Sequence, residues 1–468
     1  MNQNSGAAAV PAEQEVVAAT PHPELKAEPR PALSMVDAIA VIVGIVVGAG
    51  IFRTPSLVAA NVESSTMFLV AWILGGLVSL IGALCYAELT TTFPHAGGDY
   101  HFLTRAFGNR LAFLFAWARM SVIQTGSIAL LSFIIGDYLA QIYSIGEYSS
   151  VIYAALVVIS LTGINIIGLS YGAGTQKLFT VLEVLGVLII IVAGLLFAPE
   201  GAAAATANTM SGSTTSLGLA MVFVLLTFGG WNEAAYISAE LRTGRRGMAV
   251  ALLSSILIIT TIYLLVNLSY LNVLGLSGIA ASEAVAGDLM RVTFGEAGVV
   301  LIGLMVAISA LTSANATIFT GARTNYALGR DFPVLSYLGK WNAQTSSPVN
   351  AFIVQGAVSL ALIGLALITR NGFETMVEYT APVFWFFLLL VGIALFILRK
   401  KEPHLNRPFR VPFYPLTPLL FCLTCAYLLY SSLMYTGLGA LVGIGVLVVG
   451  AILLLLLPVL EKRRQRRT

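Results

Sequence analysis

The sequence predicts an all-α polytopic membrane protein. Of 468 residues, 58% are hydrophobic and only 10% are charged, whereas soluble domains carry about 25% charged residues. Runs of about 20 apolar residues, enough to cross about 30 Å of hydrocarbon as a helix, recur along nearly the whole chain. The small net charge of +3 gives no indication of nucleic acid binding, so the lipid bilayer is the expected environment.

Twelve membrane spans are expected, with no large soluble domain between them. The longest loops are residues 272–298 and 323–348, so function is expected inside the helix bundle. The spans are about residues 36–58, 67–90, 111–140, 150–168, 176–198, 216–240, 249–272, 298–322, 349–369, 376–398, 411–431 and 437–458.

The distribution of basic residues predicts the orientation. With a cytoplasmic N-terminus, nearly all loop lysines and arginines fall on the cytoplasmic side, and only Arg291 and Arg370 fall opposite. The positive-inside rule therefore predicts a multi-pass protein of the cell (inner) membrane with both termini in the cytoplasm. Residues 1–34, rich in Ala, Pro and Glu, are expected to form a disordered tail without a cleaved signal peptide. Residues 461–468 form a basic tail.

Two glycine-rich interruptions are predicted within spans. The first span contains VIVGIVVGAGIFRTP, from Val41 to Pro55, and the sixth contains TFGGWNE, from Thr227 to Glu233. A helix that is interrupted in lipid leaves N–H and C=O groups without hydrogen-bond partners, unless protein, water or a ligand provides them. The alternative for the first is a packing motif, Gly44-x-x-x-Gly48. Because the interruptions lie five spans apart, they predict an inverted repeat of residues 35–200 and 201–400, with accessory helices in 401–460.

The interruptions predict a site for a zwitterion. N–H groups that open a half-helix favour an anionic oxygen. Carbonyls that close a half-helix favour an ammonium group. An α-amino acid carries both charges close together, and is therefore the expected small-molecule partner. The N–H groups belong to Ala49, Gly50 and Ile51, and the carbonyls to Val46, Val47, Leu226, Thr227 and Phe228.

Ionisable residues inside the spans are candidates for gating or coupling, since such groups are costly in lipid. Arg119 in span three and Glu183 in span five lie at matching depth, about 10–12 Å from the inner face. They either pair with each other, or each pairs separately with backbone or water. Glu183 is also the candidate titrating group. Trp231, Asn232 and Glu233 follow the second interruption.

Hydroxyl and amide groups gather in two further spans. Span eight carries Ser309, Thr312, Ser313, Asn315 and Thr317. They either form interhelical hydrogen bonds or line a cation or substrate path, and Thr312 and Ser313 are the candidates for the latter. In span three a polar stripe that includes Gln124 is expected to face away from Arg119, given 100° per helical residue.

Several other classes of protein are disfavoured by the sequence. An enzyme or receptor would need a catalytic constellation or a sizeable extramembrane domain, and no metal-ligand spacing, cofactor motif or nucleophile motif is visible. Cys422 and Cys425 are interpreted as packing residues of an apolar helix rather than as metal ligands or a redox pair. A channel would need ring-forming filter repeats, and none is visible in the sequence.

Four motifs together resemble the amino acid–polyamine–organocation superfamily, and the L-type amino acid transporter group in particular. They are GIVVGAGIF, GALCYAEL with FPHAGGDYHFLTRAFG, FGGWNEAAYISAELRTGRRGMAVAL, and SANATIFTGARTNYALGRD. The resemblance runs from about residue 35 to the end of span twelve. Two positions depart from the pattern: Glu183 replaces a lysine, and Leu226 replaces an aromatic gate residue, with Phe228 two positions later.

The resemblance implies a LeuT-type 5+5 inverted repeat with alternating access and discontinuous helices 1 and 6. It implies an L-amino acid held by main-chain groups of Val46, Ala49, Gly50, Leu226 and Gly229. Sodium-independent exchange or proton-coupled uptake is implied as well, with protons as a candidate partner.

The expected function is thus secondary transport of amino acids, and of neutral ones because no acidic cluster lies at the interruptions. A polyamine or cationic amino acid carrier is the alternative, in which Glu233 would meet the extra positive charge. No covalently linked partner subunit is expected, because residues 141–149, where animal relatives carry the linking cysteine, contain none.

Overall fold

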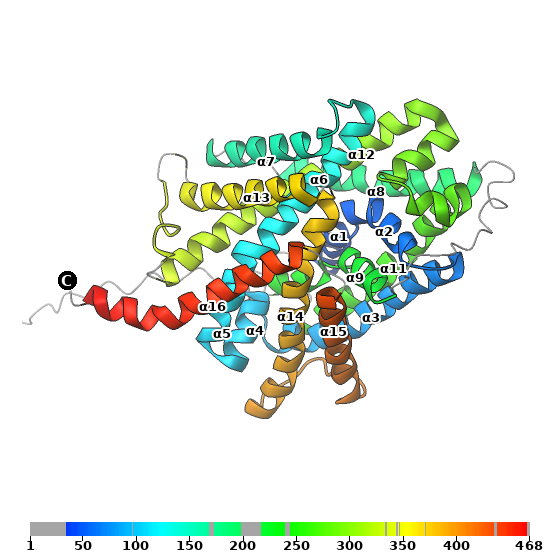
Figure 1. Ribbon diagram of the computed structural model, residues 1–468. Helices are drawn as coiled ribbons and strands as arrows, with labels where there is room; N and C mark the ends of the chain where they lie inside the picture. The colour runs from blue at the N-terminus through cyan, green and yellow to red at the C-terminus, as the bar shows by residue number, and fades with distance from the viewer. Residues whose placement is uncertain are drawn as a thin grey trace, which may run out of the picture.

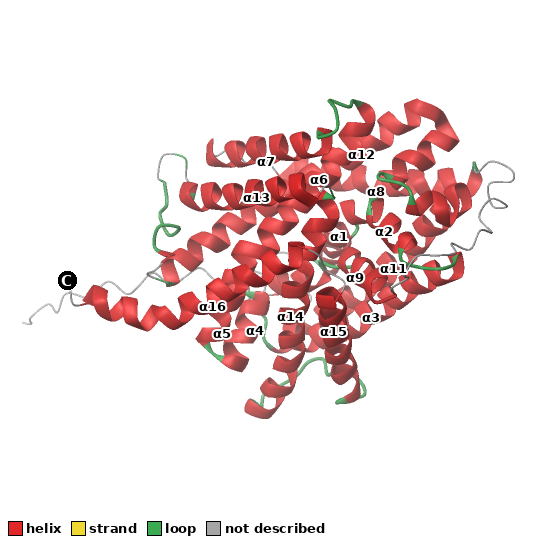
Figure 2. Ribbon diagram, in the orientation of Figure 1, coloured by secondary structure: helices red, strands yellow, loops and turns green. Residues whose placement is uncertain are grey.

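In the part of the chain that the computed structural model describes, the secondary-structure elements are all helices, joined by loops (Figures 1 and 2). That part comprises residues 34–95, 97–167, 173–197, 217–238, 244–332, 335–342, 345, 347–369, 371–434 and 438–465. Within it, nine helices are long and apolar enough to cross a membrane, or ten when the bent pair at the start counts as one span. The predicted class, an all-α polytopic membrane protein, is confirmed. The tail 1–33, residues 466–468 and the loop 198–216 lie outside the described residues.

The first half of the chain contains two short turns of tighter or wider helix among its α-helices. Its elements are α1 (Met35–Val46), η1 (Ala49–Phe52), α2 (Thr54–Ala60), α3 (Ser65–Thr92), α4 (Gly98–Phe107), α5 (Asn109–Ala118), η2 (Arg119–Ile123), α6 (Gln124–Ile142), α7 (Ser149–Ile167) and α8 (Ala173–Leu196).

The second half contains the longest helices. Its elements are α9 (Leu217–Thr227), η4 (Trp231–Glu233), α10 (Ala234–Ile237), α11 (Gly244–Ala280), α12 (Val285–Asp331), α13 (Val349–Thr369), α14 (Gly372–Lys401), α15 (Leu416–Met434) and α16 (Leu438–Gln465). The count of twelve spans stays a prediction, because the described apolar parts of α8 and α9 are short, Leu182–Leu196 and Leu217–Thr227.

The region between spans seven and eight differs from the expected loop. Residues 272–298 are mostly helical, since α11 continues to Ala280 and α12 begins at Val285. The chain turns at Gly275 and Gly295, which both have a φ of 66°. Only glycine adopts this backbone conformation without strain, so two glycines redirect helices that hydropathy alone would end.

The interrupted segments occupy the centre of the bundle. The pair formed by α1–η1 and α2 is bent by 57°. Helix α2 packs against α9, and α1 and α2 both pack against α11. Around them, α11 lies on α3, and α12 lies on α6 (Figure 1). Long continuous helices therefore surround the two places where backbone groups are exposed.

A buried carboxylate ties the end of α3 to the segment that follows α14. Glu88 is 1% exposed and accepts hydrogen bonds from Arg399 Nε at 2.7 Å and from the backbone N–H of Val411 at 2.8 Å. The Nη2 of Arg399 also contacts it, and Arg407 lies 3.4 Å away. Glu88 is thus the centre of a structural ion-pair cluster.

Replacing Glu88 by alanine is expected to destabilise the protein by about 3–5 kcal/mol, because it leaves two partly buried guanidinium groups without their shared carboxylate. The midpoint of thermal unfolding of purified protein measures this. Glu402→Ala is the control, since Glu402 pairs with an Arg105 side chain that is 40% exposed and should cost less than about 1 kcal/mol. Equal shifts for the two variants would contradict the assignment.

Candidate substrate site

The first interruption leaves two N–H groups without an acceptor in their own turn. Helix α1 ends at Val46, and the N–H of Gly48 turns back to the Val46 carbonyl at 2.7 Å. The next turn, η1, begins with the Ile51 N–H donating to the Gly48 carbonyl at 3.4 Å. The N–H groups of Ala49 and Gly50 precede that bond, so the turn gives them no partner. Two N–H groups therefore remain where three were predicted, since Ile51 is engaged.

The second interruption depends on two adjacent glycines. Helix α9 ends at Thr227, the Gly229 N–H donates to the Leu226 carbonyl at 3.0 Å, and the Glu233 N–H donates to the Gly230 carbonyl at 2.9 Å. Gly230 has a φ of 107°, and a Cβ atom there would lie 2.9 Å from the Ile45 side chain. Only glycine satisfies both the backbone conformation and the close approach to the first interrupted segment.

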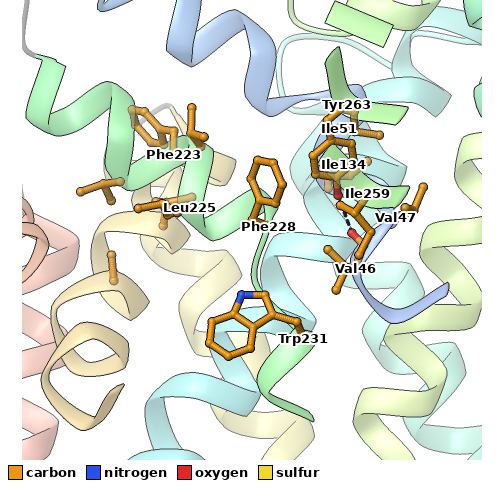
Figure 3. Close-up of a cluster of buried hydrophobic side chains, with 14 of the residues drawn as sticks. Val46, Val47, Ile51, Ile134, Phe223, Leu225, Phe228, Trp231, Ile259 and Tyr263 are labelled. Carbon is orange, nitrogen blue, oxygen red and sulfur yellow. Dashed lines mark hydrogen bonds between the residues drawn. The ribbon is translucent and has the colours of Figure 1, made fainter. Parts of the chain in front are cut away.

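A single phenol joins the two broken ends. The hydroxyl of Tyr263, on α11, donates to the Val46 carbonyl at 2.6 Å and lies 3.0 Å from the Thr227 carbonyl (Figure 3). Tyr263 is fully buried. A hydroxyl has one proton, so the two carbonyls, one from each interruption, share a single donor. Tyr263 was not among the predicted site residues, although a phenol inside an apolar helix signals a hydrogen-bond partner at membrane depth.

A cavity of about 450 Å³ lies against the interruptions. Its lining combines residues of the two interruptions with hydroxyl and amide residues of α6 and α12. The first group includes Val46, Gly48, Gly50, Leu226, Thr227, Gly229 and Gly230, and the second includes Gln124, Ser127, Ser313, Thr317 and Thr320. The volume suits a small organic solute.

Several predicted residues lie outside the cavity lining. Val47 and Ile51 are buried in packing, and Trp231 packs against Tyr86 with ring centroids 5.1 Å apart. Phe228 packs against Tyr263, with centroids 4.9 Å apart (Figure 3). The hydroxyl of Thr312 donates to the carbonyl of Ile308 in its own helix. Of the two candidates for the gate residue, Leu226 therefore lines the cavity. Phe228 is outside the lining and packs against Tyr263.

Arg119 pairs with Glu233 at one end of the cavity, which both residues line. The guanidinium makes two hydrogen bonds to the Glu233 carboxylate, at 3.1 and 3.2 Å. The predicted Arg119–Glu183 pair is wrong. The two residues bind separately, as in the alternative, but the partners found are the side chains of Glu233 and Ser309 rather than the backbone or water named there. Matching depth does not fix the direction in which a side chain points, and Glu233 follows an interruption that turns it toward span three. We call the Arg119–Glu233 pair the inner latch.

A wide helical turn places Gln124 on the same side as Arg119, contrary to the prediction. The segment η2 is a π-helix in which the Gln124 N–H donates to the Arg119 carbonyl, five residues back. This pattern inserts one residue into the helical period and rotates everything after it, so the assumption of 100° per residue fails here. Both Arg119 and Gln124 consequently line the cavity.

Glu183 is held beside the first interruption by a hydroxyl of α12. Ser309 donates to Glu183 Oε1 at 2.5 Å, and both side chains are buried, with Glu183 6% exposed. A Cβ atom on Gly48 would lie 4.0 Å from the same carboxylate oxygen. The carboxyl group is thus in place to respond to the conformation of the interrupted span.

A second ion pair, not predicted, lies next to the cavity-lining residues Thr54 and Phe373. Arg53 Nε is 3.6 Å from the Asp137 carboxylate, and its Nη1 donates to the Ser282 carbonyl at 2.9 Å. The guanidinium also lies 5.9 Å from the ring centre of Phe373, a cavity-lining residue. Arg53 belongs to the first interrupted span, Val41 to Pro55, whereas its partners come from distant segments of the chain. We call Arg53 and Asp137 the outer latch.

These features define a class: a polytopic α-helical membrane protein with a solute-sized cavity built on interrupted helices. Residues 33–457 match the amino acid permease family, and the chain belongs to that family. The predicted relationship to amino acid transporters of the amino acid–polyamine–organocation superfamily is confirmed.

Its relatives are amino acid transporters rather than enzymes. The chain is 31% identical over 412 residues to the mouse (Mus musculus) b(0,+)-type amino acid transporter 1, covering 86% of this chain and 82% of that protein. It is 28% identical over 418 residues to the human cystine/glutamate transporter, covering 87% and 82%. It is also 28% identical over 419 residues to the serine/threonine exchanger SteT of Bacillus subtilis, covering 88% and 94%.

Replacing Tyr263 by phenylalanine is expected to destabilise the protein by about 1–3 kcal/mol, because buried carbonyls lose their donor. It should also weaken substrate binding, since the two interrupted ends are no longer tied together. Thermal unfolding and amino acid uptake in proteoliposomes measure the two effects. The matched control is Tyr270→Phe on the same helix, whose hydroxyl lies 3.5 Å from the Ile51 carbonyl, a weak contact. An unchanged Tyr263→Phe protein would refute the bridging role.

Proposed function

We propose that this protein is a secondary active transporter that moves neutral L-amino acids across the cell membrane by alternating access. The observation that carries the proposal is the pairing of opposite charge preferences where the two interruptions meet. The N–H groups of Ala49 and Gly50, which have no acceptor in their own turn, suit a carboxylate. The Leu226 carbonyl has two lone pairs, of which the Gly229 N–H uses one, and the other suits an ammonium group. The ends are adjacent, since a Gly50 Cβ would lie 3.4 Å from Thr227.

The proposed architecture is a LeuT-type inverted repeat. Residues 35–200 and 201–400 are the two halves, residues 401–460 add two accessory helices, and both termini lie in the cytoplasm. Support comes from the positions of the interruptions, one near the start of each half, and from the contact of α2 with α9. In this arrangement the cavity lies midway across the membrane, between the inner and outer latches.

The inner latch favours a neutral substrate over a polyamine or cationic amino acid. A second positive charge would need a carboxylate in the cavity. Glu233 is the carboxylate there that the alternative requires, and Arg119 already neutralises it. Competition of labelled leucine uptake by a panel of amino acids and putrescine separates the two proposals. Neutral amino acids are expected to compete, whereas effective competition by putrescine would favour the alternative.

Either exchange or proton-coupled uptake fits the site, with no requirement for sodium. Exchange is supported by the similarity to a serine/threonine exchanger. Proton coupling is supported by Glu183, a buried carboxyl group that contacts α12 through Ser309 and lies beside the first interruption. Gain or loss of a proton would change the charge at the point where the span must move.

Substitution of Gly50 by leucine is expected to reduce uptake to background, because the side chain would occupy the carboxylate position against Thr227. Uptake of labelled leucine is measured at matched amounts of protein in proteoliposomes. Gly364→Leu is the control, because a Cβ atom there meets nothing within 4 Å. Normal uptake by the Gly50→Leu protein would count decisively against the site.

Glu183→Gln is expected to abolish the stimulation of uptake by an imposed pH gradient while leaving exchange measurable, since an amide cannot carry a proton between the two faces. Uptake with and without gradients of pH and sodium provides the measurement. Glu296→Gln, which alters an exposed partner of Arg291, is the control. If coupling to the pH gradient persists in Glu183→Gln, another residue carries the proton.

A further inference from the structure

A buried aspartate from outside the spans reaches the inner latch. Asp99 lies at the start of α4, the short helix between α3 and α5. Its side chain is 5% exposed, and among the described residues its Oδ1 atom is buried without a hydrogen-bond partner. A carboxylate buried in this way is costly, whereas a protonated carboxyl group is much less so. Neither the proposed substrate site nor the coupling residue uses Asp99.

The groups that face Asp99 include both members of the inner latch. Glu233 and Arg119 act on it electrostatically, and the polar side chains of Tyr86 and Asn232 lie close enough to lower its pKa. Helix α4 packs against α10, which directly follows Glu233. A change of charge on Asp99 is therefore felt by both partners of the ion pair.

The other charged groups near α4 lie toward its far end. Lys401 of α14 donates to the Ala106 carbonyl at 2.8 Å, and Arg105 pairs with Glu402. Arg110 of α5 is exposed. On α4 itself, His101 stacks on His95 with ring centroids 4.1 Å apart, and burial lowers the pKa of His101 to about 4. That histidine is consequently neutral near neutral pH, and Asp99 is the group of α4 that changes charge there.

The balance of charge and burial sets the range in which Asp99 titrates. Burial raises its pKa to about 7, and the charge of Glu233 acts in the same direction. The polar side chain of Tyr86, the charge of Arg119 and the polar side chain of Asn232 oppose this rise. The carboxyl group is therefore neutral below about pH 7 and ionised above it.

We propose that Asp99 is a proton-binding residue that controls the inner latch from the cytoplasmic side of the protein. When Asp99 is neutral, Arg119 stays paired with Glu233, and the second half of span six remains packed against span three. When Asp99 is ionised, it repels Glu233 and competes for Arg119, so the latch loosens. The inner end of the cavity thus opens more readily as cytoplasmic pH rises. This inference rests on the alternating access and orientation of the proposed function.

The test measures access to the cavity rather than transport. Thr317→Cys places a thiol on the cavity wall, and its rate of reaction with a membrane-impermeant maleimide is followed from about pH 6 to about pH 8. The full-length protein is used in sealed vesicles with the cytoplasmic face outward. Protein without the introduced cysteine gives the background from the native thiols.

The comparison is made between Asp99 variants at each pH, because maleimides react with the thiolate and the intrinsic rate itself rises with pH. Relative to Asp99→Asn, the protein with Asp99 should label at an equal rate at the acidic end and severalfold faster at the alkaline end. Asp99→Glu should restore the dependence, because it keeps a titrating group. Asp288→Asn, which alters a partner of Arg291, should leave the profile unchanged.

The outcomes separate this inference from the proposed function. Parallel profiles for Asp99 and Asp99→Asn would overturn the inference even if leucine is transported normally. The expected difference in labelling, in a protein that transports no amino acid, would support the latch while rejecting the proposed substrate. Asp99→Glu also separates loss of the charge from loss of folding, because a misfolded site would not regain the pH profile.

Discussion

The structure depends on a shortage of hydrogen-bond donors where two helices come apart inside the bundle. Carbonyls at Val46 and Thr227 end separate half-helices, and one hydroxyl, that of Tyr263, serves both. In lipid such groups would otherwise be stranded at a cost of several kcal/mol each. Long helices α3, α6, α11 and α12 surround this point. The cavity exists because the backbone is not fully paired with itself there.

The two latches have the same chemical form. Each joins an arginine to a carboxylate from a different span: Arg53 to Asp137, and Arg119 to Glu233. Both tie an interrupted span to α5–η2–α6, the helix of span three. An ion pair that breaks must be resolvated, and alternating access provides water on one side at a time. This symmetry fits the proposed mechanism, in which the latches open in turn.

Glycine positions and hydropathy predicted much of the fold and part of the site. The runs of apolar residues gave the helical class, and Gly48 to Gly50 and Gly229 to Gly230 marked where the chain departs from helix, because few other residues permit such turns. The polar path could be predicted only in part. Ser313 lines the cavity, whereas Thr312 bonds within its own helix.

The partners of the charged residues could not be predicted, because they depend on rotations that accumulate along a helix. The π-helical turn at Arg119–Ile123 shifts all later residues of span three. Glu233 follows a turn at Gly230, which has a φ of 107°. Helical periodicity does not predict the direction of a side chain after such a turn. Arg53, Asp137 and Ser282 come from three separate segments, and only their fold brings them together.

The central claim is that main-chain groups at the interruptions bind both charged ends of the substrate. Its most direct test is the affinity of purified protein for leucine and for two analogues of the same carbon skeleton, one lacking the carboxylate and one lacking the ammonium group. Leucine is expected to bind, and neither analogue is expected to compete measurably with it. Competition by either analogue at concentrations similar to those of leucine would show that the main-chain groups do not bind both charged ends.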